Sequence, residues 1–193
     1  RRYIAGSTDI LQIKDSSANK GGVFSSAIAE VLTAFLFGDE YENRLIEDID
    51  TRWALIRDIM NLVRTYASEE TAILLKIHEK DPSVPLFVLS EKTSEQLFAF
   101  QSIVADHLEE ILSDDTLKWQ ILESYIPDVI VENLGKKAIL DILDSDKLIA
   151  YRNAILTKKL AAVAFYQNGL EWDAYVDKAQ SDFTGTVKAL FQS

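Results

Sequence analysis

A single strand-like run stands alone in this sequence, and its isolation constrains the fold more than any other feature. Apolar and polar residues alternate over residues 9–15, between Ser7-Thr8 and Ser16-Ser17. Elsewhere the apolar residues recur every three or four positions, which indicates helices. Because one strand cannot build a sheet by itself, the sequence predicts a mainly α fold with one orphan strand.

The first half of the chain is expected to form two helices and a break. A glycine-containing turn over residues 16–22 leads into a helix that should stop at Gly38. An acidic stretch then starts a long helix that reaches about residue 67, because acidic side chains favour the positive end of a helix. Pro82 and Pro85 predict the clearest internal break.

The second half is also expected to be helical. Thr93 and Gln96 fit a capping box that would start one helix. Helical periodicity weakens over residues 129–144, after which Ser145 or Asp146 is expected to cap a long helix stopped by residues 168–169. A final helix is expected over residues 171–191.

Composition excludes several classes of function. The net charge of -11 would repel nucleic acid and anionic membranes, and no continuous apolar run reaches the roughly 18 residues of a membrane span. There are no cysteines, and the two histidines, His78 and His107, lie far apart, so no metal site is expected. The chain is expected to be intracellular and cytoplasmic, or mitochondrial if eukaryotic, and its first residue, which is not Met, suggests a fragment or processed product.

The stretch over residues 19–26, Asn-Lys-Gly-Gly-Val-Phe-Ser-Ser, is the one segment that carries chemistry. Two glycines let a backbone pass close to a ligand, and the helix that follows offers unpaired N–H groups to an anion. Residues 1–30 are also the basic end of the chain, at +1. By these residues alone, a plain Gly-Gly turn with local serine capping remains the commoner explanation.

Residues 14–23, with Ser25-Ser26 and residues 30–32, closely resemble the last strand–loop–helix of the coenzyme domain in glutamate dehydrogenases. The Lys after the Asn and the preceding Lys-Asp-Ser-Ser are more similar to the large NAD-specific enzymes of this family. Residues 150–155 loosely resemble the long C-terminal helix that packs against the substrate domain, although Arg152 also fits a surface position. The resemblance implies a helical C-terminal segment carrying the last strand–loop–helix of a Rossmann-like coenzyme domain.

The resemblance also implies roles for individual residues. Asn19 would contact the nicotinamide end of NAD, with Gly21 and Gly22 beside it as coenzyme-binding residues. Val23 and Ser26 would line the glutamate pocket, with the Ser26 hydroxyl on the side-chain carboxylate. Phe24 departs from the small residue usual in the family, and the family's catalytic Lys and Asp fall outside this segment, so no catalytic residue is expected here.

The resemblance suggests three parts: residues 1–38 as the end of the dinucleotide-binding domain, residues 39–144 as a helical elaboration, and residues 145–193 as C-terminal helices. The parent enzyme would oxidise L-glutamate to 2-oxoglutarate and ammonia with NAD, would assemble as a homo-oligomer, and would need the rest of its chain for activity. The alternative is a non-catalytic helical interaction domain in which the Gly-Gly turn is structural.

Overall fold

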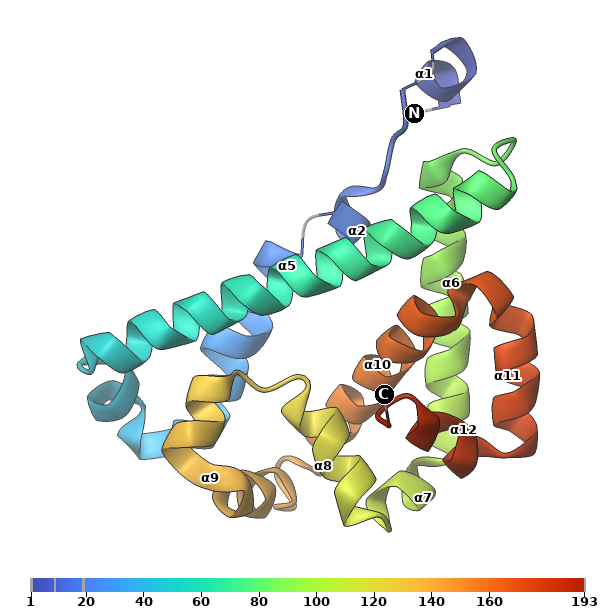
Figure 1. Ribbon diagram of the computed structural model, residues 1–193. Coiled ribbons are helices and arrows are strands. Elements are labelled where there is room, and N and C mark those ends of the chain that lie inside the picture. The colour runs from blue at the N-terminus through green and yellow to red at the C-terminus, as the bar shows by residue number, and fades with distance from the viewer. Residues whose placement is uncertain (1, 9, 19, 193) are drawn as a thin grey trace.

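The computed structural model describes residues 2–8, 10–18 and 20–192, and within this part of the chain it contains helices and no strand (Figure 1). The first half comprises α1 (Arg2–Ser7), α2 (Asp15–Ala18), α3 (Gly21–Phe24), η1 (Ser25–Leu32), α4 (Thr33–Phe37), η2 (Gly38–Glu40), η3 (Glu42–Ile46) and α5 (Ile49–Lys80). The second half comprises α6 (Leu86–Asp106), α7 (Leu108–Leu112), α8 (Asp115–Glu123), α9 (Asp128–Leu143), α10 (Ile149–Asn168), η4 (Gly169–Glu171), α11 (Trp172–Ser181) and α12 (Phe183–Ala189). The prediction of a mainly α fold is therefore confirmed.

The long helix α5 runs along one side of the molecule, and most other helices lie against it or below it in Figure 1. Its 32 residues span about 48 Å at 1.5 Å per residue. The Asp48 carboxylate caps it by accepting hydrogen bonds from the backbone N–H groups of Asp50 and Thr51, at 3.1 and 3.0 Å. It ends before the two prolines, as expected, although it extends well past residue 67.

One hydrophobic core joins the three parts that the sequence suggested. Residues 28–37, much of α5 and α6, and the helices from α8 to α12 contribute buried side chains to a single cluster. At its centre the ring of Trp172 lies 5.2 Å from that of Phe100 and 5.0 Å from that of Phe165. These edge-on contacts between aromatic rings fasten α11 to α6 and α10.

The expected orphan strand is not formed among the described residues of its segment, and Asp9 lies outside them. Residues 10–14 are irregular and run beside α5 in Figure 1, with Ile10 and Leu11 exposed and Ile13 packed on a small cluster around Leu74. A strand needs a neighbour to pair its backbone N–H and C=O groups, and none is present in the described chain. The alternating pattern predicted a strand, but the described residues provide no second strand with which this segment could pair.

Several expected helix ends were wrong because packing overrode local capping signals. Thr93 is buried within α6, which begins seven residues earlier, just after Pro85. The weakly periodic residues 129–143 belong to α9, which has a non-helical backbone conformation at Gly135. Neither Ser145 nor Asp146 caps α10, which begins at Ile149 without a side-chain cap. The expected final helix is two helices that meet at Asp182.

Residues 21–37 form one continuous helical run that contains residues 21–26 of the predicted ligand-binding stretch. The run ends at Gly38, as expected, because φ there is +50° and favours glycine. Residues 22–40 are long and apolar enough to cross a membrane by length and composition alone. Ile28, Leu32 and Leu36 lie in the core, but only 28% of the tested window is buried. One such helix is weak evidence for a membrane span.

Candidate functional site

The predicted site residues lie at the start of this helical run. Gly21 and Gly22 form the first turn of the helix. The sequence had placed both glycines in a turn that precedes the helix. Val23 is 70% exposed, and Ser26 is exposed with its hydroxyl 3.4 Å from the Glu30 carboxylate. Asn19 lies outside the described residues.

Ser26 belongs to a π-helical segment, η1, that follows α3 directly. At its end the backbone N–H of Thr33 reaches the carbonyls of Ile28 and Glu30, and the Thr33 hydroxyl donates to the carbonyl of Ala29 at 2.6 Å. π-Helical turns are rare and are frequently found at functional sites. The unusual winding overlaps the stretch that the sequence singled out only at Ser25 and Ser26.

Lys20 precedes the run and is anchored by a buried carboxylate. Its ammonium lies 2.7 Å from Glu70 on α5, which also accepts a hydrogen bond from the Tyr166 hydroxyl at 2.7 Å. Glu70 is only 5% exposed, so these donors offset the cost of burying its charge. The ion pair ties the predicted ligand-binding segment to α5 and α10.

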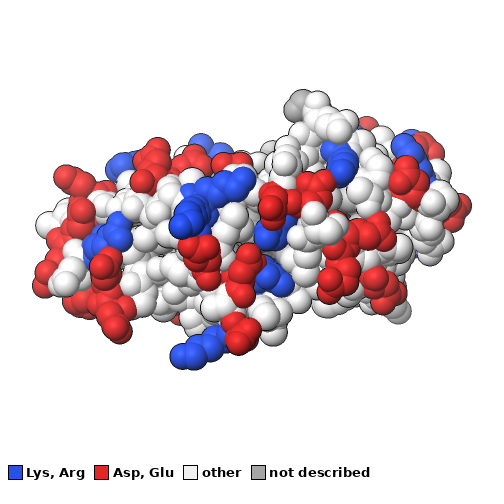
Figure 2. All heavy atoms as spheres, turned by 90° about the horizontal axis from the view of Figure 1, so that it is seen from below, with Lys and Arg blue, Asp and Glu red and all other residues white. Residues whose placement is uncertain are grey.

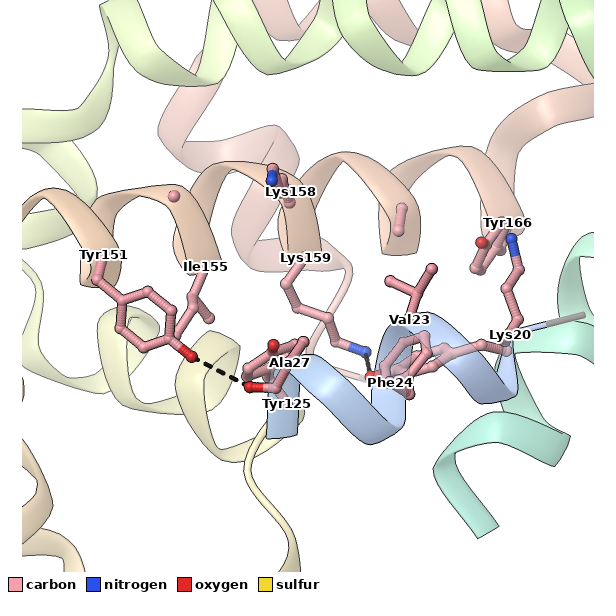
Figure 3. Close-up of a pocket in the computed structure, with 13 residues that line it drawn as sticks. Lys20, Val23, Phe24, Ala27, Tyr125, Tyr151, Ile155, Lys158, Lys159 and Tyr166 are labelled. Atoms are coloured by element: carbon pink, nitrogen blue, oxygen red, sulfur yellow. Dashed lines mark hydrogen bonds between the residues drawn. The ribbon is translucent and has the colours of Figure 1, made fainter. Parts of the chain in front are cut away.

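A cavity of about 320 Å³ opens between residues 20–27, α5 and α10 (Figure 3). Most of its lining is apolar or aromatic, and the lining residues are Lys20, Val23, Phe24, Ala27, Tyr66, Tyr125, Tyr151, Ala154, Ile155, Lys158, Lys159, Ala162 and Tyr166. Val23 is therefore beside this cavity, whereas Ser26 is not part of its wall. The predicted site and the loosely similar C-terminal helix meet here.

Lys159 is the most unusual group in the cavity wall. It is 8% exposed, donates a hydrogen bond to the Tyr66 hydroxyl, and lies 4.0 Å from the centre of the Tyr66 ring. The Tyr66 hydroxyl in turn donates to the carbonyl of Ser124 at 2.8 Å. Burial lowers the pKa of Lys159 to about 8, with Glu69 opposing this shift.

Two tyrosines close the other end of the cavity. The Tyr151 hydroxyl donates a hydrogen bond to the carbonyl of Ala27 at 3.4 Å (Figure 3), and the Tyr125 hydroxyl interacts with that of Tyr151. Burial raises the pKa of both phenols, so both stay neutral at ordinary pH. This end of the cavity offers hydroxyl groups and no charge.

Sequence reasoning did not single out Lys159 or Tyr66. A signal was present, because Lys159 falls on the buried stripe of α10 with Ile155, Leu156 and Leu160. A charged residue on an apolar stripe is either paired or functional. Arg152, two turns earlier on the same helix, is the paired case. It is buried and bonded to Asp144, whose pKa is lowered despite burial by hydrogen bonds from Arg152 and Lys118.

The remaining titratable groups suggest no second site. His78 contacts the carbonyl of Val84 at 2.9 Å, and His107 contacts Glu110 at 2.7 Å. Within the described residues, no group of three or more His, Asp or Glu side chains is arranged to hold a metal ion. Lysine and arginine side chains are interspersed among the acidic ones on the face that Figure 2 shows, without forming one basic patch.

The chain is similar to the C-terminal part of large NAD-specific glutamate dehydrogenases. It is 26% identical over 171 residues to a probable NAD-specific glutamate dehydrogenase of Schizosaccharomyces pombe, over 86% of this chain and 15% of that protein. It is 27% identical over 163 residues to the NAD-specific glutamate dehydrogenase of Neurospora crassa and 24% identical over 169 residues to that of Saccharomyces cerevisiae, over 81% and 82% of this chain.

The chain spans about 15% of the length of these curated relatives. No protein-family profile matches it, and no solved structure matches it.

Proposed function

We propose that this chain is part of an NAD-dependent glutamate dehydrogenase, an oxidoreductase that converts L-glutamate to 2-oxoglutarate and ammonia. The observation that carries the proposal is the extent of the similarity to the relatives, which covers more than four fifths of the chain. A match of this extent includes much of the helical region after residue 38. In that enzyme NAD would accept the hydride from glutamate.

The role we propose for this chain is to bind and orient, because the family's catalytic Lys and Asp would come from elsewhere in the parent chain. Asn19, Gly21 and Gly22 would face the coenzyme, and Val23 and Ser26 would face glutamate. Gly22 supports this assignment: a Cβ built there meets nothing within 4 Å, so packing does not require a glycine. A close approach of the coenzyme to the backbone would explain a glycine at position 22, since packing within this chain does not require one.

We propose further that the parent enzyme is a cytoplasmic or mitochondrial homo-oligomer. In that enzyme residues 1–38 would form the end of the dinucleotide-binding domain, residues 39–144 would be a helical elaboration, and residues 145–193 would be the C-terminal helices that pack against the substrate domain. The net charge of -11 supports the absence of nucleic-acid and membrane partners at this part of the enzyme. L-Glutamate, 2-oxoglutarate and the rest of the parent chain are its expected partners.

A non-catalytic helical interaction domain is the second candidate, favoured by one observation. Four apolar side chains on α5, Ile49, Trp53, Ile56 and Met60, are between 38% and 58% exposed. Their spacing of four, three and four residues forms one stripe suited to packing against another helix. An interaction domain would need this stripe and would not need the glycines.

The test is to assay the longest open reading frame that encodes this chain for NAD reduction that depends on L-glutamate. We expect turnover by that protein and none by residues 1–193 alone, because hydride transfer needs substrate and coenzyme held in one geometry by groups from both parts. A longer protein that folds and shows no glutamate-dependent reduction would favour the interaction domain. Turnover by the isolated chain would contradict the assignment of the catalytic groups.

A further inference from the structure

The cavity between residues 20–27 and α10 has the size and the lining of a small-molecule site. Its volume of about 320 Å³ falls in the range of ligand pockets, which are mostly apolar with a few placed polar groups. Val23, Phe24, Ile155 and Ala162 supply apolar walls, and the Phe24 ring stacks on the Tyr66 ring at 4.8 Å. The walls suit a flat or branched apolar body.

One buried cation defines the polar end of this cavity. The Lys159 ammonium has three N–H donors, of which one serves the Tyr66 hydroxyl. Among the described residues, no carboxylate lies within ion-pair distance of it. A buried cation that lacks a carboxylate partner is unfavourable, and an anionic ligand would remove that cost.

The other two lysines of the wall play different parts. Lys20 is already held by Glu70 at 2.7 Å, so its charge is largely offset. Lys158 is exposed at the surface, where water screens its charge, and it projects away from Lys159 in Figure 3. The cavity therefore offers one strong position for an anion, and the phenols of Tyr125 and Tyr151 at its far end add no charge.

We propose that this cavity binds a small organic monocarboxylate with an aromatic or branched apolar body, its carboxylate on the Lys159 ammonium and its body between Val23, Phe24 and Ala162. Glutamate does not fit this description, because the far end of the cavity offers its second carboxylate and its ammonium only the neutral hydroxyls of Tyr125 and Tyr151 and no opposite charge. The lowered pKa of Lys159, about 8, supports the proposal, since the amine is still charged at neutral pH and would be stabilised by a bound anion.

The ligand would bridge the predicted coenzyme segment and α10. Residues 20–27 form one wall and residues 151–166 of α10 form the other, so a bound molecule would hold them together. This proposal goes beyond the function proposed above and does not depend on it, because the site lies wholly within this chain. A failure here would leave the dehydrogenase assignment standing.

The test is a titration of the 193-residue chain with 3-phenylpropionate, using 3-phenylpropanamide as the neutral analogue of the same shape. Binding is followed by NMR shifts of the tyrosine rings, without NAD or glutamate present. We expect the carboxylate to bind about tenfold or more tighter than the amide, as a charge-assisted hydrogen bond in a buried site would give. Equal affinity of the two compounds, or binding of neither, would overturn the proposal.

Variants locate the site. Lys159→Met keeps the length of the side chain and removes its charge, and should weaken carboxylate binding about tenfold or more while leaving the amide unchanged. Lys147→Met is the control, because Lys147 is exposed and does not line the cavity, and it should change binding less than about threefold. Ala162→Phe should fill the cavity and abolish binding of both compounds. If Lys159→Met does not fold, the Ala162→Phe variant and the comparison of the acid with the amide still test the proposal. Undiminished binding of the carboxylate to a folded Lys159→Met or Ala162→Phe variant would contradict the proposed site.

Discussion

At the scale of single residues, the burial of the Lys159 ammonium lowers the stability of the folded chain. Folding lowers its pKa from 10.5 to about 8, so between these values the unfolded chain binds more protons than the folded one. Stability therefore rises with pH across this window, and the full cost applies below pH 8. The cost is about 3 kcal/mol, since one pKa unit corresponds to about 1.4 kcal/mol.

We therefore expect Lys159→Met to raise the free energy of unfolding by about 1–3 kcal/mol at pH 7 and by less at pH 9.5. Urea denaturation followed by circular dichroism at the two pH values measures the difference. The other charged or titratable groups near Lys159 are common to both proteins: Lys20, Lys158, Tyr66, Tyr125, Tyr151 and Tyr166 line the cavity, whereas Glu69 and Glu70 are not part of its wall. Lys158→Met is the control and should change stability little at either pH; an equal gain at both values would rule out titration of Lys159 as the cause.

Ser26 belongs to the same scale and tests the proposed substrate contact in the complete enzyme. A hydrogen bond to a charged carboxylate is typically worth roughly 1.5–3 kcal/mol. That carboxylate keeps its charge during hydride transfer, so Ser26→Ala should raise the KM for glutamate by about tenfold and lower kcat less. Water filling the gap favours this lower end of the range.

Steady-state kinetics that vary glutamate and NAD separately check the Ser26 prediction. Ser25→Ala is the matched control, because Ser25 is the neighbouring exposed serine on the same segment and has no proposed contact with glutamate. An unchanged KM for glutamate together with a weakened affinity for NAD would show that Ser26 serves the coenzyme instead.

At the scale of elements, two glycines of one helical run have opposite requirements. Gly38 ends the run at φ +50°, ψ -126°, a conformation that side chains with a Cβ avoid. Gly22 lies in the first turn with open space around it. The fold therefore needs a glycine at position 38 and tolerates a side chain at position 22.

We expect Gly38→Ala to lower the free energy of unfolding by about 1–3 kcal/mol and Gly22→Ala to leave it unchanged or raise it by up to about 1 kcal/mol. Thermal and urea unfolding of the two variants of the isolated chain measure this contrast. In the complete enzyme, Gly22→Ala should still weaken NAD binding if the backbone approaches the coenzyme. Wild-type NAD affinity in that variant would remove Gly22 from the coenzyme site.

At the scale of the whole molecule, the exposed stripe on α5 predicts self-association. Its side chains repeat at four, three and four residues, the spacing by which two helices interlock. Asp50 and Arg64 are exposed along one side of the stripe at opposite ends, so an antiparallel copy would bring unlike charges together. A second copy of this chain is thus a partner of matching chemistry.

We expect the isolated chain to dimerise and Trp53→Asp to shift it to a monomer, as measured by light scattering over a range of concentrations. Trp53 is 54% exposed in the single chain, and a carboxylate there would be buried without a partner in the dimer. Phe98→Asp is the matched control, because Phe98 is 68% exposed on a different helix and should not matter. A wild-type chain that stays monomeric at every concentration would contradict the prediction.

The sequence alone determined the helical class and several boundaries, because these depend on local chemistry. Apolar residues at helical spacing, a glycine where φ must be positive and two prolines between α5 and α6 each act within a few residues of their own position. Residues 14–32 likewise carried the family resemblance that the comparisons support.

Only the tertiary structure decided which residues meet, because contacts between distant segments leave no local pattern. The run over residues 10–14 has the alternation of a strand, yet it stays irregular because the described chain supplies no strand to pair with it. Thr93 looked like a helix cap and is buried inside α6, since packing outweighs a capping preference of about 1 kcal/mol. Lys159 and Tyr66 are 93 residues apart and became one site only when α10 packed against α5.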